Sequence, residues 1–196
     1  MAQPDVIAGH LVAAGLLIES DPGRAFAHAQ AAKALAGRSG AVREAVGVTA
    51  YAAGDYATAL AELRAARRIT GSAEHLPLLA DCERGLGRPD RALAVAAEPE
   101  AKQLDRPGQV ELAIVVSGAR RDLGQPEAAV LALQGRELDS DEVNDWTPRL
   151  WYAYADALLA AGRTDDARQW FTATVAVDED DTTDAVERLE ELGGGS

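Results

Sequence analysis

The sequence is poor in cysteine, aromatic residues and lysine, and each shortage narrows the possible folds and functions. A single cysteine, Cys82, cannot close a disulfide within the chain, which excludes a disulfide-stabilised secreted scaffold and makes a cytoplasmic location the expectation. Aromatic residues make up 5% of the 196 residues, whereas alanine is abundant throughout. A core that depends on alanine rather than on aromatic side chains favours closely packed helices over sheets.

Positive charge is also scarce. The chain has 19 basic and 32 acidic residues, a formal net charge of −13, and its only lysines are Lys33 and Lys102. Nucleic acids and anionic membranes require concentrated basic residues, so we expect neither as a partner. The hydrophobic run 6–18 is too short to span a bilayer. Arginine and alanine, used so heavily, indicate a GC-rich genome, and we expect a bacterial source.

One pattern recurs along the chain. A glycine turn is followed, five residues later, by an alanine in the next helical segment, and the turn glycines are 33, 37 and 38 residues apart. A weaker first copy has Ser20-Asp21-Pro22 in the turn and Ala25 after it. Five units therefore fill nearly the whole chain. The four clear copies are Gly54 with Ala59, Gly87 with Ala92, Gly124 with Ala129, and Gly162 with Ala167.

Each part of this pattern has a physical meaning. Glycine tolerates the left-handed conformation that ends a helix. The Asp, Pro or Thr that follows is suited to the start of the next helix. The alanine then allows the two antiparallel helices to approach closely. A single hairpin cannot bury its own apolar face, whereas a stack of hairpins buries a continuous core.

On these residues the chain resembles the tetratricopeptide repeat family. The fifth unit matches that family's pattern best. Two features depart from it, because the closing proline is missing at most matching places and extra residues follow the third and fourth units, at 98–108 and 135–147. We expect these longer connections to perturb the superhelical pitch. The matching residues of the fifth unit are Trp151, Tyr154, Ala155, Leu158, Ala167 and Phe171.

The predicted fold is therefore an all-α solenoid of about five helical hairpins. The segment 184–192 is predicted to form a charged C-terminal capping helix, with Asp184 and Glu187 at the spacing of a capping box. We expect residues 1–192 to form a single domain and 193–196 to be an added Gly/Ser linker. The sequence leaves open whether the chain is a fragment of a longer protein.

The resemblance implies that the first helix of each hairpin lines a concave surface. Positions i, i+4 and i+7 of each first helix share a face. Of these, seven are the candidate partner-binding residues: Glu44, Tyr51, Asp81, Arg84, Arg121, Tyr152 and Asp156. We expect Arg84 and Arg121 to fix carboxylates of a partner. The same face is predicted to include His10, Ala14, Leu17, Val48, Pro77, Ile114, Gly118 and Leu159.

Motifs for catalysis and for cofactor or metal binding are missing from the sequence. Cys82 and His75 are seven residues apart on one predicted helix, and Cys82 is interpreted as a buried small residue rather than a nucleophile. His10, His28 and His75 lack metal-ligand spacing, and the acidic runs 139–142 and 178–181 lack the glycine and closing glutamate of a calcium loop. We expect no enzyme activity, cofactor or metal.

The predicted function is that of a scaffold or adaptor that binds an unidentified protein or peptide in the concave groove. Three alternatives remain open. One is a regulatory sensor of a peptide or small ligand, another is an accessory subunit of an enzyme complex, and the third is a self-assembling module that forms a homo-oligomer.

Overall fold

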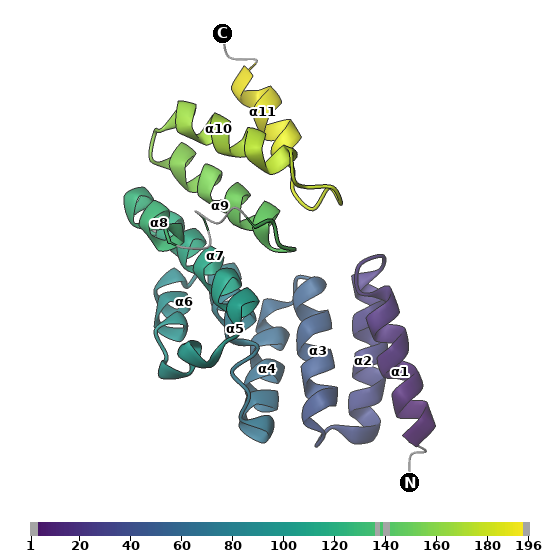
Figure 1. Cartoon of the computed structure of the whole chain (residues 1–196). Helices are drawn as coiled ribbons and strands as arrows, with labels where there is room; N and C mark the ends of the chain where they lie inside the picture. Colours follow the sequence, from purple (N-terminus) through teal and green to yellow (C-terminus); the bar gives the residue numbers. More distant parts are fainter. Residues whose placement is uncertain (1–3, 136–137, 139–141, 194–196) are drawn as a thin grey trace. The chain divides into compact units, whose positions relative to one another are not determined.

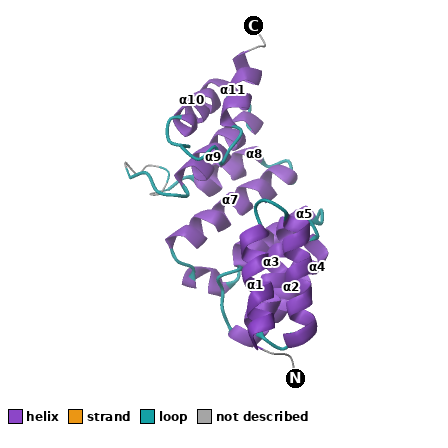
Figure 2. Ribbon diagram, turned by 90° about the vertical axis from the view of Figure 1, so that its right-hand side faces the viewer, coloured by secondary structure: helices purple, strands orange, loops and turns teal. Residues whose placement is uncertain are grey.

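The computed structural model describes residues 4–135, 138 and 142–193, and all regular secondary structure in these residues is helical (Figures 1 and 2). A short 3-10 helix, η1, lies between the sixth and seventh α-helices. This arrangement confirms the predicted all-α class. The elements are α1 (Pro4–Leu17), α2 (Pro22–Ala36), α3 (Gly40–Ala52), α4 (Tyr56–Thr70), α5 (Leu76–Gly85), α6 (Pro89–Ala96), η1 (Pro99–Gln103), α7 (Arg106–Asp122), α8 (Pro126–Leu133), α9 (Thr147–Ala160), α10 (Thr164–Val175) and α11 (Ala185–Gly193).

The predicted turns form as the sequence chemistry requires. The four turn glycines have φ between 69° and 77°, in the left-handed region that favours glycine. The next helix begins directly after each turn. Asp55 caps α4 by accepting a hydrogen bond from the backbone N–H of Thr58 at 3.0 Å, and Pro89, Pro126 and Thr164 are the first residues of α6, α8 and α10.

The alanines that follow the turns are all buried. Their exposed fractions are 0–1%, and this includes Ala25 of the eroded first unit. Each lies on the second helix of a hairpin whose two helices pack against each other. The predicted close approach of paired helices is therefore confirmed in all five hairpins.

The chain divides into two compact units, 1–101 and 102–196. The boundary falls inside η1, in the longer connection that follows the third hairpin. The expected single domain over 1–192 stays a prediction. Gly193 ends α11, while the rest of the Gly/Ser tail, 194–196, lies outside the described residues.

In the first unit, three hairpins pack in sequence order. Helix α2 packs on α3, α4 packs on α5, and the first helices also meet, α1 with α3 and α3 with α5. Two buried carboxylates join the hairpins. Glu62 forms salt bridges with Lys33 Nζ at 2.7 Å and with Arg43 Nη1 at 2.8 Å. Glu83 forms a salt bridge with Arg64 Nη2 at 2.8 Å. Each of these glutamates on α4 or α5 thus binds a cation from a neighbouring helix.

In the second unit, two hairpins are followed by the capping helix. Helix α9 packs against both α7 and α8, and α11 packs against α10. Phe171 is fully buried among the residues of this core, and Tyr154 and Leu158 belong to the same cluster. The predicted final helix over 184–192 is confirmed, beginning one residue later than expected. Its backbone starts with a hydrogen bond from Arg188 N–H to the Asp184 carbonyl.

Candidate protein-binding surface

The structure places the seven candidate residues in two clusters, one within each unit. Glu44, Tyr51, Asp81 and Arg84 lie on α3 and α5 of the first unit. Arg121, Tyr152 and Asp156 lie on α7 and α9 of the second. Three other residues assigned to the same face are buried and therefore do not line a surface, namely Ala14, Pro77 and Gly118.

In the first unit, Asp81 is the centre of the cluster. The Tyr51 hydroxyl donates to Asp81 Oδ2 at 2.6 Å, and Arg84 Nη1 donates to Asp81 Oδ1 at 2.8 Å. Burial and then the hydrogen bond to Asp81 raise the pKa of Tyr51, so this hydroxyl stays protonated. The bond connects α3 to α5 and therefore joins two consecutive hairpins.

A second contact joins the same two hairpins. His75, directly before α5, has its Nε2 atom 3.3 Å from Oε1 of Glu44 on α3. His75 thus lies against Glu44, a pairing that the repeat pattern does not predict. Cys82, on α5, is fully buried, and desolvation raises the pKa of its thiol to about 12. At neutral pH this residue is a protonated thiol rather than a nucleophilic thiolate.

In the second unit, Asp156 is held by two arginines. Its Oδ2 atom accepts a hydrogen bond from Arg121 on α7, and its Oδ1 atom accepts one from Arg188 Nη2 on α11 at 3.1 Å. Arg188 also lies over the ring of Phe171, 5.8 Å from its centre. The carboxylate on α9 therefore connects the fourth hairpin to the capping helix.

Tyr152 lies beside this ion-pair network. Its ring makes an edge contact with Phe171, with ring centres 5.4 Å apart, and its hydroxyl lies near the Asp184 carboxylate. Burial, and then the interaction of its hydroxyl with Asp184, raise the pKa of Tyr152. Tyr152 thus has one apolar and one polar contact to elements that follow α9.

These second-unit residues surround a cavity of about 430 Å³. Ile114 and Ala153 supply apolar wall, and the segment 182–184 before α11 closes one side. Arg149 also lines the cavity and donates to Glu111 at 2.7 Å. Four predicted face positions therefore come together here: Ile114, Arg121, Tyr152 and Asp156.

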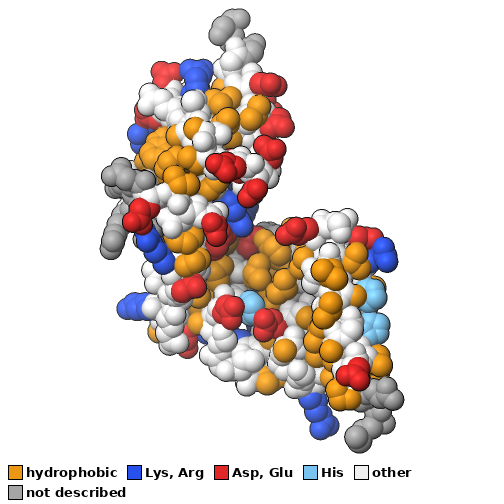
Figure 3. All heavy atoms as spheres, turned by 45° about the vertical axis from the view of Figure 1, so that its right-hand side comes forward, with side chains coloured by type: hydrophobic (Ala, Val, Ile, Leu, Met, Phe, Trp, Pro, Cys, Tyr) orange, Lys and Arg blue, Asp and Glu red, His pale blue; other side chains and the backbone are white. Residues whose placement is uncertain are grey.

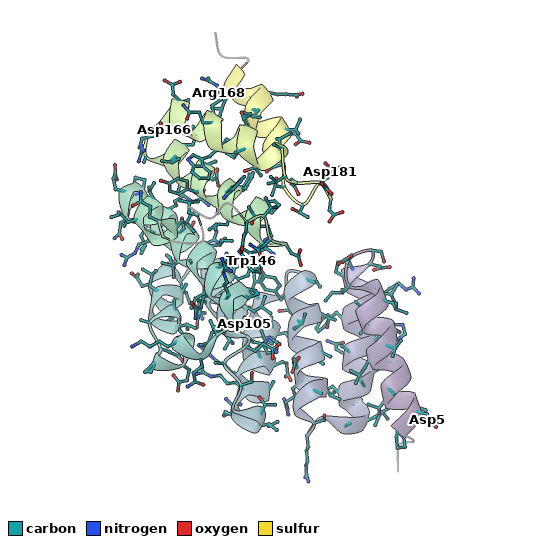
Figure 4. The ribbon with its side chains drawn as sticks, in the orientation of Figure 1. Asp5, Asp105, Trp146, Asp166, Arg168 and Asp181 are labelled. Atoms are coloured by element: carbon teal, nitrogen blue, oxygen red, sulfur yellow. The ribbon has the colours of Figure 1, made fainter. Side chains whose placement is uncertain are left out.

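The repeat pattern did not predict the other contributors, because Arg188 and the segment 182–184 lie outside the repeat and Arg149 lies about one turn before the predicted face positions of α9. Arg188 lies on the capping helix and the segment 182–184 on the loop before it (Figure 4 labels Asp181 in that loop). Arg149 is in the first turn of α9, the helix that begins directly after Trp146 (labelled in Figure 4). The predicted capping helix was the one sequence feature that indicated contacts between this end of the chain and the preceding hairpin.

The acidic run 178–181 lies in the same loop and contributes hydrogen bonds within it. Asp178 accepts hydrogen bonds from the backbone N–H and the hydroxyl of both Thr182 and Thr183, at 2.6–2.9 Å. Within residues 4–135, 138 and 142–193, no group of three or more His, Cys, Asp or Glu side chains is arranged to hold a metal ion. Residues 139–141 of the other acidic run lie outside the described residues.

None of the helices in the described part of the chain is long and apolar enough to cross a membrane. No protein-family model matches the sequence, and no curated protein matches it.

Similarity appears at the level of structure. The thermophilic TPR protein TTC0263 of Thermus thermophilus matches with a TM-score of 0.74 and 18% identity, over 95% of this chain and 98% of that one. A putative kinesin light chain of Podosopora anserina with nearly identical TPR-like repeats matches with a TM-score of 0.63 and 15% identity, over 93% and 99% of the two chains. Together with the five hairpins, four of which have glycine turns, these matches show that the chain has the tetratricopeptide repeat fold.

Proposed function

We propose that this chain is a non-catalytic scaffold or adaptor that binds a protein or peptide partner on the face formed by α7 and α9. The observation that carries the proposal is the cavity of about 430 Å³ between these two first helices and the loop before α11. Ligand sites are commonly concave, with apolar walls and a few polar groups that fix orientation. Ile114, Ala153 and the Tyr152 ring supply the apolar part, and Arg121 and Asp156 supply the polar part.

The charges of this site indicate how a partner would bind. Arg121 already pairs with Asp156, and Arg149 already pairs with Glu111. A partner carboxylate therefore has to exchange with a carboxylate of the chain itself. Asp156 can release Arg121 at reduced cost, because it keeps its second partner, Arg188. Arg121 is then available for a charge-assisted bond to the partner.

The experiment is an affinity purification from the source cell with matched bait variants. Arg121→Gln removes the charge at the cavity. Arg120→Gln, at the neighbouring position on α7, removes the charge of a side chain that donates a hydrogen bond to Gln125 instead. We expect a specific protein to be recovered by the original chain and by Arg120→Gln, and to be lost or weakened at least tenfold with Arg121→Gln. Equal affinity for all three baits would place the site elsewhere.

Further measurements distinguish the remaining alternatives. A recovered enzyme whose rate changes on binding would identify an accessory subunit. A melting temperature that shifts with a small metabolite, with no protein recovered, would identify a ligand sensor. A cytoplasmic location is also part of the proposal, and fractionation of the source cell tests it.

Self-association is a second candidate, and the first helix favours it. Within α1, Val12 is 61% exposed and Leu16 is 79% exposed, and the only charged side chain is Asp5. In a chain of net charge −13, two copies repel each other least where charge is sparsest. Light scattering at high concentration tests this. A dimer that Leu16→Glu dissociates would support it, and a monomer at every concentration would contradict it.

A further inference from the structure

The first hairpin brings two histidines into contact. His10 on α1 and His28 on α2 have their Nδ1 atoms 3.0 Å apart, and their ring centres are separated by 5.2 Å. Histidine side chains lie next to each other on the surface of this unit (Figure 3). The sequence alone does not reveal this contact. The two residues are 18 positions apart, and they meet only because the turn between α1 and α2 folds the second helix back along the first.

The hairpin holds the two rings together through its small residues. Ala14, one turn after His10, is 1% exposed, and Ala29, next to His28, is fully buried in the same cluster. Small side chains allow α1 and α2 to approach closely. Both imidazoles are only partly buried, so an ion from solution can reach them.

The separation of the two nitrogens matches the spacing between adjacent ligands of a metal ion. With metal–nitrogen bonds of about 2.0–2.1 Å, two nitrogens at a right angle are about 2.9 Å apart, and at a tetrahedral angle about 3.4 Å apart. The observed 3.0 Å is close to the right-angled value. Square or tetragonal coordination by nitrogen and oxygen is typical of Cu²⁺ and Ni²⁺, for which imidazole is a good ligand.

We propose that His10 and His28 form a two-imidazole site that binds one Cu²⁺ or Ni²⁺ ion through their Nδ1 atoms. Without the ion, one Nδ1–H donates to the other Nδ1. With it, each ring carries its proton on Nε2 and both Nδ1 lone pairs turn to the metal. The described residues supply no third His, Cys, Asp or Glu, so water completes the coordination.

Such an ion would fasten the terminal helix to its neighbour. One face of α1 packs against the rest of the first unit, and its opposite face exposes apolar side chains (Figure 3). A metal ion bound to both α1 and α2 stabilises the folded state, and this stabilisation grows with the logarithm of the free metal concentration above the dissociation constant. The structural effect is therefore expected in the first hairpin and not in the second unit.

The experiment uses the full chain without a polyhistidine tag. Calorimetric titration with NiCl₂ measures stoichiometry and affinity, and electron paramagnetic resonance with one equivalent of CuCl₂ counts the coordinated nitrogens. We expect one ion per chain, a copper signal split by two nitrogens, and slower amide exchange in α1 on binding. His10→Gln and His28→Gln should each lower the affinity at least tenfold and leave one nitrogen on copper.

His75→Gln is the matched control, because His75 lies against Glu44 instead. Its affinity should equal that of the original chain, and circular dichroism should show that all three variants keep their helix content. Unchanged binding in the His10 and His28 variants would overturn the proposal. A copper signal from one nitrogen in the original chain, or one ion shared by two chains, would overturn it as well.

Discussion

Gly47 on α3 and Leu63 on α4 approach so closely that a Cβ atom added at position 47 would lie 2.6 Å from Leu63 Cγ. Both residues are buried, and Leu63 is among the largest side chains with no exposed surface. The close packing of α3 against α4 therefore depends on the absence of a side chain at position 47. Position 47 belongs to the first helix, whereas Ala59 allows close approach from the second.

Gly47→Ala is expected to destabilise the fold although alanine is the better helix former. Overpacking of a full core costs about 1–3 kcal/mol, which exceeds the gain of about 1 kcal/mol in helix propensity. Gly15→Ala on α1 is the control, because no atom lies within 4 Å of its added Cβ, and it should stabilise. Urea unfolding measures both. A stabilised Gly47→Ala variant would show that α3 and α4 can separate freely.

The pairing of Glu83 predicts an asymmetry between two substitutions. The Glu83 side chain is 1% exposed, whereas its partners Arg64 and Arg88 are 48% and 46% exposed. Arg64→Met leaves a buried carboxylate with only the longer 3.5 Å contact to Arg88, at a cost of about 3 kcal/mol. Glu83→Gln leaves half-exposed arginines in water and should cost about 1 kcal/mol. Equal free energies of unfolding for the two variants would contradict this account.

Asp55 predicts a contribution to stability that depends on pH. Hydrogen bonds from the side chain and the backbone N–H of Thr58 lower the pKa of this carboxyl in the folded chain. The stabilisation is therefore present above the unfolded value of about 3.9 and is lost as the pH falls through the folded value. Asp55→Asn keeps a capping oxygen but does not titrate.

Urea unfolding of both proteins from pH 3 to pH 7 tests this. The original chain should lose more stability on acidification than Asp55→Asn, with the difference confined to pH values below about 4. Asp55→Ala removes the cap and should cost about 1 kcal/mol at neutral pH. Parallel pH profiles for the original chain and Asp55→Asn would show that the hydrogen bonds of Thr58 do not favour the ionised carboxylate.

Cys82 is expected to resist alkylation while the chain is folded. Burial first, and then the neighbouring Asp81 and Glu83, raise the pKa of the thiol to about 12, so almost no thiolate exists at pH 8. Iodoacetamide should label Cys82 slowly in buffer and rapidly in denaturant, as measured by mass spectrometry. Rapid labelling of the folded chain would indicate local opening of α5.

The repeat could be predicted from the sequence because its signals are local. Gly87 and Ala92 lie five residues apart, and the turn geometry and helix contact that each requires depend on near neighbours. The candidate site was predictable only in part. Arg121 and Asp156 followed from the repeat register, whereas Arg188 reaches Asp156 from a helix outside it.

The histidine pair illustrates the same limit. His10 and His28 meet across a turn, and their contact depends on the rotation of α1 against α2, which the repeat pattern does not encode. The division of the chain at 101 was likewise not predicted, although the extra residues at 98–108 marked the place.

The sequential packing of the hairpins has a consequence for folding kinetics. Helices within each unit meet mainly the helix before and the helix after them, so most of the loops that must close are short. Chains with such low contact order fold quickly, in microseconds to milliseconds. Each closed turn offers a separate starting point, and structure can grow outward from any of them.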